Sequence, residues 1–117
     1  MFSFRVEYTI RILIELELRA RAGIMGVPIV WFRDVCGGDS QGLSIVMRLL
    51  LKRDWVNYDK STFLYSGNVN IEDVSLYEVC TQIEESVESL PKSIRSDKIS
   101  MKLKSLFEGI KLSDMIL

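Results

Sequence analysis

Apolar side chains recur every three or four residues near the start of the chain, which is the spacing of one face of an α-helix. The stretch Phe4–Ala22 contains neither Gly nor Pro, so we expect a first helix there, with Ser3 placed to cap its start. Gly23 and Gly26 end this segment. The apolar positions that set the period are Val6, Ile10, Leu13 and Ile14.

Two further helices are predicted next, with a tight turn between them. Pro28–Val35 begins with a proline, which suits the first turn of a short helix. Gly37–Gly38 then interrupts the pattern. Asp39 or Ser40 is placed to cap the following helix, which runs to about Lys52.

The helix that ends near Lys52 is predicted to be amphipathic. Gly42 near its start costs about 1 kcal/mol relative to Ala in a helix, so something other than helix propensity selects it. One side of the helix follows the i, i+3, i+4, i+7 spacing of a buried face, at Leu43, Val46, Met47 and Leu50. The opposite side carries a polar stripe of Gln41, Ser44 and Arg48.

A small antiparallel hairpin is predicted after these helices. Trp55–Tyr58 and Thr62–Tyr65 alternate in polarity and are rich in aromatic residues, as paired strands are, and residues 59–61 separate them. The polar stretch Ser66–Asp73 is then expected to be a loop.

Two helices are predicted in the last third of the chain. Ser75–Glu78 has the sequence of a capping box, which opens a helix over Leu76–Ser89 that Pro91 stops. A polar connection leads to a last helix over Lys98–Gly109. The apolar end, Leu112–Leu117, indicates a segment that docks on the rest of the protein.

This order of elements is typical of a helix-turn-helix followed by a two-stranded wing. We therefore predict a mostly α fold, a winged helix-turn-helix with a small two-stranded β wing and C-terminal dimerisation helices. Residues 1–73 would form the DNA-binding region and residues 74–117 the C-terminal helices, within a single compact domain. The polar stripe suits this role, because Gln can pair with adenine and Arg with guanine or phosphate. A solvated helix face without a ligand is the alternative explanation of the same stripe.

Composition favours binding over catalysis. The 117 residues include 15 basic and 16 acidic side chains, two Cys and no His, and His is the commonest general base and metal ligand. We therefore predict no catalytic residue, no metal site and no cofactor. No apolar run reaches the ~18 residues that a membrane helix needs, so we expect a cytoplasmic protein without a membrane partner. There Cys36 and Cys80 would be reduced and buried.

Four segments carry a resemblance to a known family. Ser3–Leu13, with a basic residue two places after its Ser and then a Tyr, resembles the opening of the bacterial winged-helix regulators grouped with IscR, NsrR and CymR, the Rrf family. Val27–Val56 fits that family's helix-turn-helix without a gap. Val74–Val79 resembles its entry to the next helix, and Ile110–Met115 resembles its end. The order and spacing of these short motifs carry the likeness, which covers nearly the whole chain.

The resemblance implies a sequence-specific DNA-binding transcriptional regulator, and it favours a repressor over an activator. It would act as a homodimer on a near-palindromic site in double-stranded DNA, under an effector or protein partner that the sequence does not identify. Near the DNA backbone, or bracing the helix-turn-helix, would lie Arg5, Tyr8 and Arg11. The residues implied at DNA are Ser40, Gln41, Ser44, Arg48, Arg5, Tyr8, Lys60 and Ser61. Members of the family pair through the long C-terminal helix, which implies a seam at Leu103, Leu106, Phe107 and Ile110.

The chain also departs from the family in four places. Its wing, Asp59–Phe63, is about three residues shorter than the family's and has no Gly. Gly42 stands where the family has Tyr, and Ser44 where it has an acidic base-contacting residue. Leu90–Asp97 lacks the three Cys of cluster-binding members, which argues against an iron–sulfur or nitric-oxide sensor. These departures and the slight acidic balance leave an alternative: a protein-interaction dimer derived from this family, whose DNA-binding face has decayed.

Overall fold

A computed structural model describes residues 3–83 and 105–116 of the chain. The helices and the two-stranded antiparallel sheet follow one another in the predicted order, so the predicted mostly α winged-helix fold is confirmed. The elements are α1 (Phe4–Arg21), α2 (Ile29–Val35), α3 (Ser40–Lys52), β1 (Val56–Asp59), β2 (Leu64–Gly67), α4 (Leu76–Ile83) and the 3₁₀ helix η2 (Leu112–Met115). Within the described ranges, no helix is both long and apolar enough to cross a membrane.

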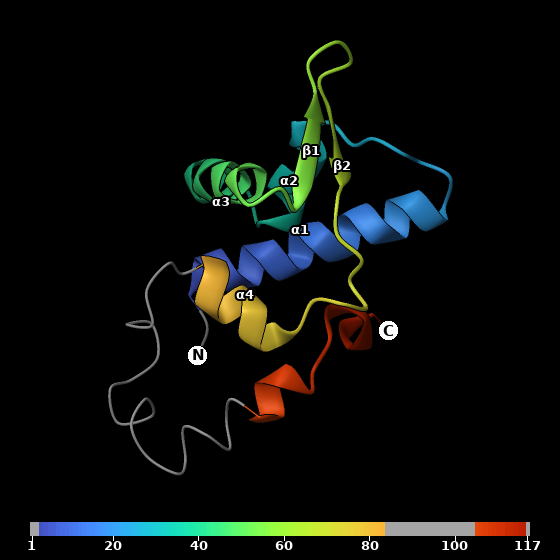
Figure 1. The fold of residues 1–117 in the computed structure, drawn as a ribbon. Helices are drawn as coiled ribbons and strands as arrows, with labels where there is room; N and C mark the ends of the chain where they lie inside the picture. Colours follow the sequence, from blue (N-terminus) through green and yellow to red (C-terminus); the bar gives the residue numbers. More distant parts are fainter. Residues whose placement is uncertain (1–2, 84–104, 117) are drawn as a thin grey trace.

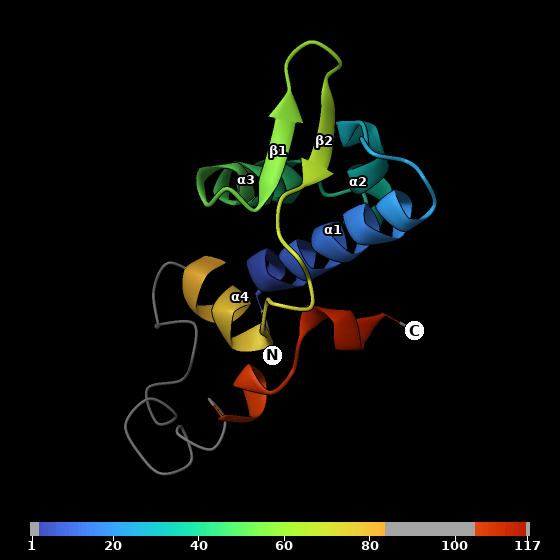
Figure 2. The same cartoon turned by 45° about the vertical axis from the view of Figure 1, so that its right-hand side comes forward.

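Helix α1 runs through the middle of the molecule. The α2–α3 pair and the hairpin lie on one side of it, and α4, residues 105–108 and η2 lie on the other, as Figures 1 and 2 show from two directions. A helix with neighbours on both sides must be apolar over much of its circumference. The buried positions of α1 are Val6, Thr9, Ile12, Leu13 and Leu16.

The start of α1 differs from the prediction. Ser3 occupies the position before the helix, but its side chain makes no capping hydrogen bond. The Ser3 hydroxyl is buried and has no partner among the described residues. Only the Ser3 carbonyl takes part, because it accepts the N–H of Glu7 at 3.1 Å.

One apolar core joins the elements on the two sides of α1. Phe32 of α2, Leu50 of α3 and Ile83 of α4 are all 0% exposed, and both cysteines are buried, as predicted. Burying an aliphatic or aromatic side chain of this size stabilises the fold by roughly 1.5–3 kcal/mol. The core therefore fixes how α2 and α3 sit on α1.

The hairpin begins one residue later than predicted and its second strand two residues later. Asp59 pairs with Leu64 at the last rung, so the connecting loop covers residues 60–63. The reason is that the Asp59 carbonyl accepts the N–H of Phe63 at 2.8 Å, which closes a wider turn than the predicted one. At the other end, Tyr65 and Val27 exchange both backbone hydrogen bonds, at 2.8 and 2.9 Å. This bridge fastens β2 to the residues that precede α2.

The C-terminal segment packs on the start of α4. Half of the predicted capping box is present: Ser75 Oγ accepts the N–H of Glu78 at 3.1 Å, whereas the Glu78 carboxylate accepts the Ser75 hydroxyl at 3.5 Å. Leu112 is 0% exposed, and its N–H donates to the Val74 carbonyl at 2.9 Å, which confirms that this apolar end docks on the protein. The predicted continuation of α4 to Ser89 lies outside the described residues. Of the predicted last helix, only residues 105–108 are described as helical.

Candidate nucleic-acid interface

The surface most suited to a ligand is the outer side of α3. The row that includes Val46 and Leu50 is buried in the core, as predicted. Gln41, Ser44 and Arg48 are all exposed on the opposite side. Ile45 interrupts this polar row and is 39% exposed. The helix is therefore fixed by one side and leaves the other free for contact.

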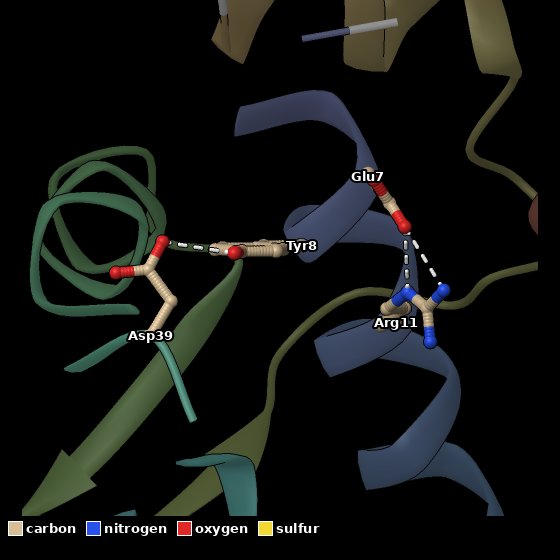
Figure 3. A network of polar contacts seen from close by, with 4 residues as sticks. All are labelled: Glu7, Tyr8, Arg11 and Asp39. Carbon is tan, nitrogen blue, oxygen red and sulfur yellow. Dashed lines mark hydrogen bonds and ion pairs between the residues drawn. The ribbon is translucent and has the colours of Figure 1, made fainter. Parts of the chain in front are cut away.

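The first turn of α3 is held by a network from two helices. Asp39 caps α3, because its Oδ1 accepts the N–H of Gly42 at 2.9 Å. Its second oxygen, Oδ2, accepts the hydroxyl of Tyr8 from α1 at 2.9 Å, as Figure 3 shows. Tyr8 thus connects α1 to the N-cap of α3.

The same network explains Gly42. A Cβ atom at this position would lie 2.8 Å from Cε2 of Tyr8 and still closer to the Asp39 carboxylate. Such a contact is shorter than van der Waals packing allows, so only Gly fits under the Tyr8–Asp39 pair. The cost of Gly in a helix, noted from the sequence, is offset by this close approach.

The electrostatics of the pair favour its charged and hydrogen-bonded form. The Gly42 N–H and then the Tyr8 hydroxyl lower the pKa of Asp39 below its ordinary value. The hydrogen bond to Asp39 is the main reason that the pKa of Tyr8 is raised. At neutral pH Asp39 is therefore ionised and Tyr8 protonated, which is the pairing that the hydrogen bond requires.

The two arginines near the start of α1 are engaged within their own helix. Arg11 donates to the Glu7 carboxylate at 2.9 Å, one helical turn away (Figure 3). Arg5 lies 5.9 Å from the centre of the Phe4 ring and is half-buried. Ion pairs as exposed as that of Arg11 are weak, so Arg11 could exchange Glu7 for a phosphate.

An open groove of about 390 Å³ runs between α2, α3 and β2. Arg33 of α2 and Arg48 of α3 both line it, together with Ser40 and Ser44. Neither arginine has an ion-pair partner in the part of the chain that the structure describes. Arg33 was not predicted from the sequence. No periodic pattern marks it, because Arg33 comes near Arg48 only when α2 packs beside α3.

The tip of the wing carries the last two predicted site residues. Lys60 is exposed. Ser61 is bonded within the loop, because its N–H and its hydroxyl both donate to Oδ1 of Asp59, at 2.8 and 2.6 Å. The hydrogen bond from the Ser61 hydroxyl is the main reason that the pKa of Asp59 is lowered. The tip is thus a hydrogen-bonded turn with one outward cation.

Cys36 lies just before the turn between α2 and α3 and is 3% exposed. Burial raises the pKa of its thiol to about 11. The thiol is therefore protonated at neutral pH and a poor nucleophile, so Cys36 serves the core.

The predicted dimer seam is divided by the structure. Leu106 is 58% exposed, whereas Phe107 and Ile110 are half-buried against the core of the same chain. Leu103 lies outside the described residues. An apolar side chain as exposed as Leu106 suits a seam, and the pairing itself stays a prediction.

The fold is a winged helix in which the outer side of α3 is exposed. The crystal structure of Staphylococcus aureus CymR matches the fold with a TM-score of 0.71 and 17% sequence identity, over 97% of this chain and 95% of that one. Its oxidised form matches with a TM-score of 0.71 and 15% identity, over 98% and 94%. T. potens IscR matches with a TM-score of 0.65 and 16% identity, over 98% and 85%.

These neighbours are regulators of the Rrf family, whose resemblance the sequence motifs indicated, so that resemblance is confirmed at the level of the fold. Neither a protein-family model nor a curated protein matches the sequence. The comparisons therefore establish a winged-helix fold like that of CymR and IscR over nearly the whole chain.

Proposed function

We propose that this protein is a DNA-binding transcriptional regulator that acts as a homodimer on a near-palindromic site. One observation carries the proposal: Gln41, Ser44 and Arg48 stand exposed on the outer side of α3 while its inner side is locked in the core. A helix presented in this way can enter the major groove without any rearrangement of the protein.

The proposed roles follow from the groove and the capping network. Gln41, Ser44 and Arg48 meet base edges or phosphates, and Ser40 at the start of α3 faces a phosphate. Arg33 joins them, because it lines the same groove as Arg48. Tyr8 positions α3 through Asp39.

The remaining contacts are to the DNA backbone and to a second subunit. Lys60 at the wing tip and Arg5 on α1 supply phosphate contacts, with Ser61 shaping the turn that carries Lys60. A symmetric dimer would hold its two recognition helices ~34 Å apart, one turn of the duplex. Leu106 is the exposed part of the seam that we propose with Leu103, Phe107 and Ile110.

The test begins with selection of bound duplex fragments from the source genome, followed by affinity measurements on the best fragment over a range of salt concentrations. We expect affinity to fall steeply with salt, as it does when basic side chains displace counterions. We expect Arg48→Ala to weaken binding roughly 10-fold or more, as loss of one specific base contact does.

The matched control is Arg21→Ala, which removes the same charge from the far end of α1, where Arg21 pairs with Glu17 at 2.9 Å. It should change affinity less than about 2-fold, because it removes only distant, screened charge. Equal effects of the two substitutions would refute the assignment of Arg48 to the DNA interface.

The exposed Ile45 in the polar row favours one other function, a protein-interaction dimer whose DNA-binding face has decayed. This alternative predicts no salt-dependent binding to any selected fragment. It also predicts that Ile45→Asp abolishes capture of a partner protein. Salt-dependent binding that Arg48→Ala weakens would exclude it.

A further inference from the structure

The wing tip carries an aromatic side chain that the fold does not need. Phe63 is 68% exposed and does not belong to the core or to the residues packed against it. Its backbone has a φ of 59°, in the left-handed region where a bulky residue is strained and where Gly or Asn fits better. Neither burial nor backbone geometry therefore accounts for Phe at this position.

The turn holds Phe63 in place from the inside. The Phe63 N–H donates to the Asp59 carbonyl at 2.8 Å. The Asp59 carboxylate accepts the N–H and the hydroxyl of Ser61, which fixes the other side of the loop. With its backbone bonded inward, the turn leaves the Phe63 ring outside.

The hairpin beneath the tip is stiffened by a row of aromatic rings. Tyr58 and Tyr65 pair across the strands with ring centroids 4.7 Å apart. Tyr65 in turn meets Phe32, which is fully buried, edge to face at 6.2 Å. Together with the Tyr65–Val27 bridge, this row connects the wing to the core. The tip of the wing, which contains no Gly, is therefore supported from the core.

The charge and placement of the tip favour DNA as the partner of Phe63. Lys60 is exposed in the same loop, and the carboxylate of Asp59 is hydrogen-bonded to Ser61 within the turn. β1 starts only four residues after α3 ends and contacts it, so the wing lies next to α3, and the tip projects beyond α3 in both views (Figures 1 and 2). A cation beside an exposed apolar ring is the combination that minor-groove wedges use, where Phe, Leu or Met enters between base pairs.

We propose that Phe63 is such a wedge: its ring enters the minor groove beside the site where α3 docks and partly unstacks one base step. The proposal rests on the proposed function, and names the side chain by which the short wing replaces a Gly-rich one. Lys60 holds the neighbouring phosphate, and the duplex bends away from the wing at the opened step.

The experiment uses the full chain and a 30-base-pair duplex taken from the best selected genomic fragment, with 2-aminopurine placed at each step in turn. Wild-type protein should raise the 2-aminopurine fluorescence several-fold at one or two steps outside the bases that α3 covers. Phe63→Leu, which keeps an apolar wedge, should retain this signal. Phe63→Ala should lose it, together with the bend measured by energy transfer between the duplex ends, and should bind about 10-fold more weakly.

Met25→Ala is the matched control, because Met25 is 74% exposed and lies in the loop between α1 and α2. It should leave fluorescence, bend and affinity at the wild-type level. The wedge is overturned when Phe63→Ala keeps all three readouts, or when wild-type protein brightens no step, while Arg48→Ala still weakens binding; the proposed function then stands. Absence of salt-dependent binding by wild-type protein overturns the proposed function and the wedge together.

Discussion

Helix α3 and the wing are neighbours in the chain, but the fold holds them in different ways. Five residues of α3 are buried, and its first turn is capped by Asp39 and braced from α1 by Tyr8. The wing buries only Val56 of β1, and its tip is closed by hydrogen bonds within the loop. The core therefore sets the position of α3, whereas hydrogen bonds within the loop set the shape of the wing tip.

The largest change in stability is expected from a substitution in the buried row of α3. Leu50→Ala should lower the free energy of unfolding by about 2–5 kcal/mol, because Leu50 is fully buried and its removal leaves a cavity. Urea unfolding followed by circular dichroism measures this loss. Leu18→Ala, at a position that is 41% exposed, should cost less than about 1 kcal/mol. Similar losses at the two positions would mean that the core does not hold α3.

A smaller loss is expected from crowding the first turn of α3. Gly42→Ala should lower the free energy of unfolding by about 1 kcal/mol, since overpacking costs about 1–3 kcal/mol and exceeds the gain in helix propensity. Gly67→Ala is the control, because a Cβ there would make an ordinary 3.7 Å contact with Leu16. A thermal melt compares the two variants. If Gly42→Ala stabilised the protein, the Tyr8–Asp39 pair would not be packed against α3 as described.

A substitution at the wing tip should instead increase the stability of the protein. Phe63→Asn is expected to raise the free energy of unfolding by about 0.5–1 kcal/mol, because Asn adopts the left-handed region with less strain and no buried contact is lost. Lys60→Asn, in the same loop at an ordinary φ, should leave stability unchanged. Chemical denaturation of the two variants decides it. A loss of stability in Phe63→Asn would show that the ring contributes to the fold.

The smallest effect concerns pH. The pKa of Asp39 is lowered in the folded protein, so its ionised form contributes stability above the ordinary Asp pKa of about 3.9. That stability is lost as the pH falls through the lower, folded pKa. Asp39→Asn should therefore flatten the fall in melting temperature between pH 5 and pH 2.5, and Tyr8→Phe should flatten it in part. An unchanged profile in Asp39→Asn would contradict the network of Figure 3.

Much of the helix-turn-helix was predictable, because a helix that packs on one side leaves a period of three to four in its sequence. This period located α3 and separated Leu50 from Arg48. The strand boundaries were less accurate, since turn length depends on a hydrogen bond between Asp59 and Phe63 that has no periodic signature. The Ser75 cap of α4 was predicted correctly because Ser75 and Glu78 lie within four residues.

The candidate site divides in the same way. Gln41 and Ser44 were found because their exposure follows from the burial of their neighbours on one helix. Arg33 was missed, since its nearness to Arg48 arises only when α2 packs beside α3. The bonds from Ser61 to Asp59 also depend on the turn that the chain forms, and the predicted phosphate contact of Ser61 stays a prediction.

We could predict from the sequence alone the order of the elements, the buried and exposed sides of α3 and the likeness to a winged-helix family, because each depends on residues close together in the chain. The hydrogen bond from Tyr8 to Asp39, 31 residues away, and the close approach of both to Gly42 depend on tertiary packing. The exposed, strained position of Phe63 at the tip of the wing is likewise visible only in the structure. Contacts between distant residues depend on how whole elements pack, and local sequence patterns do not encode that packing.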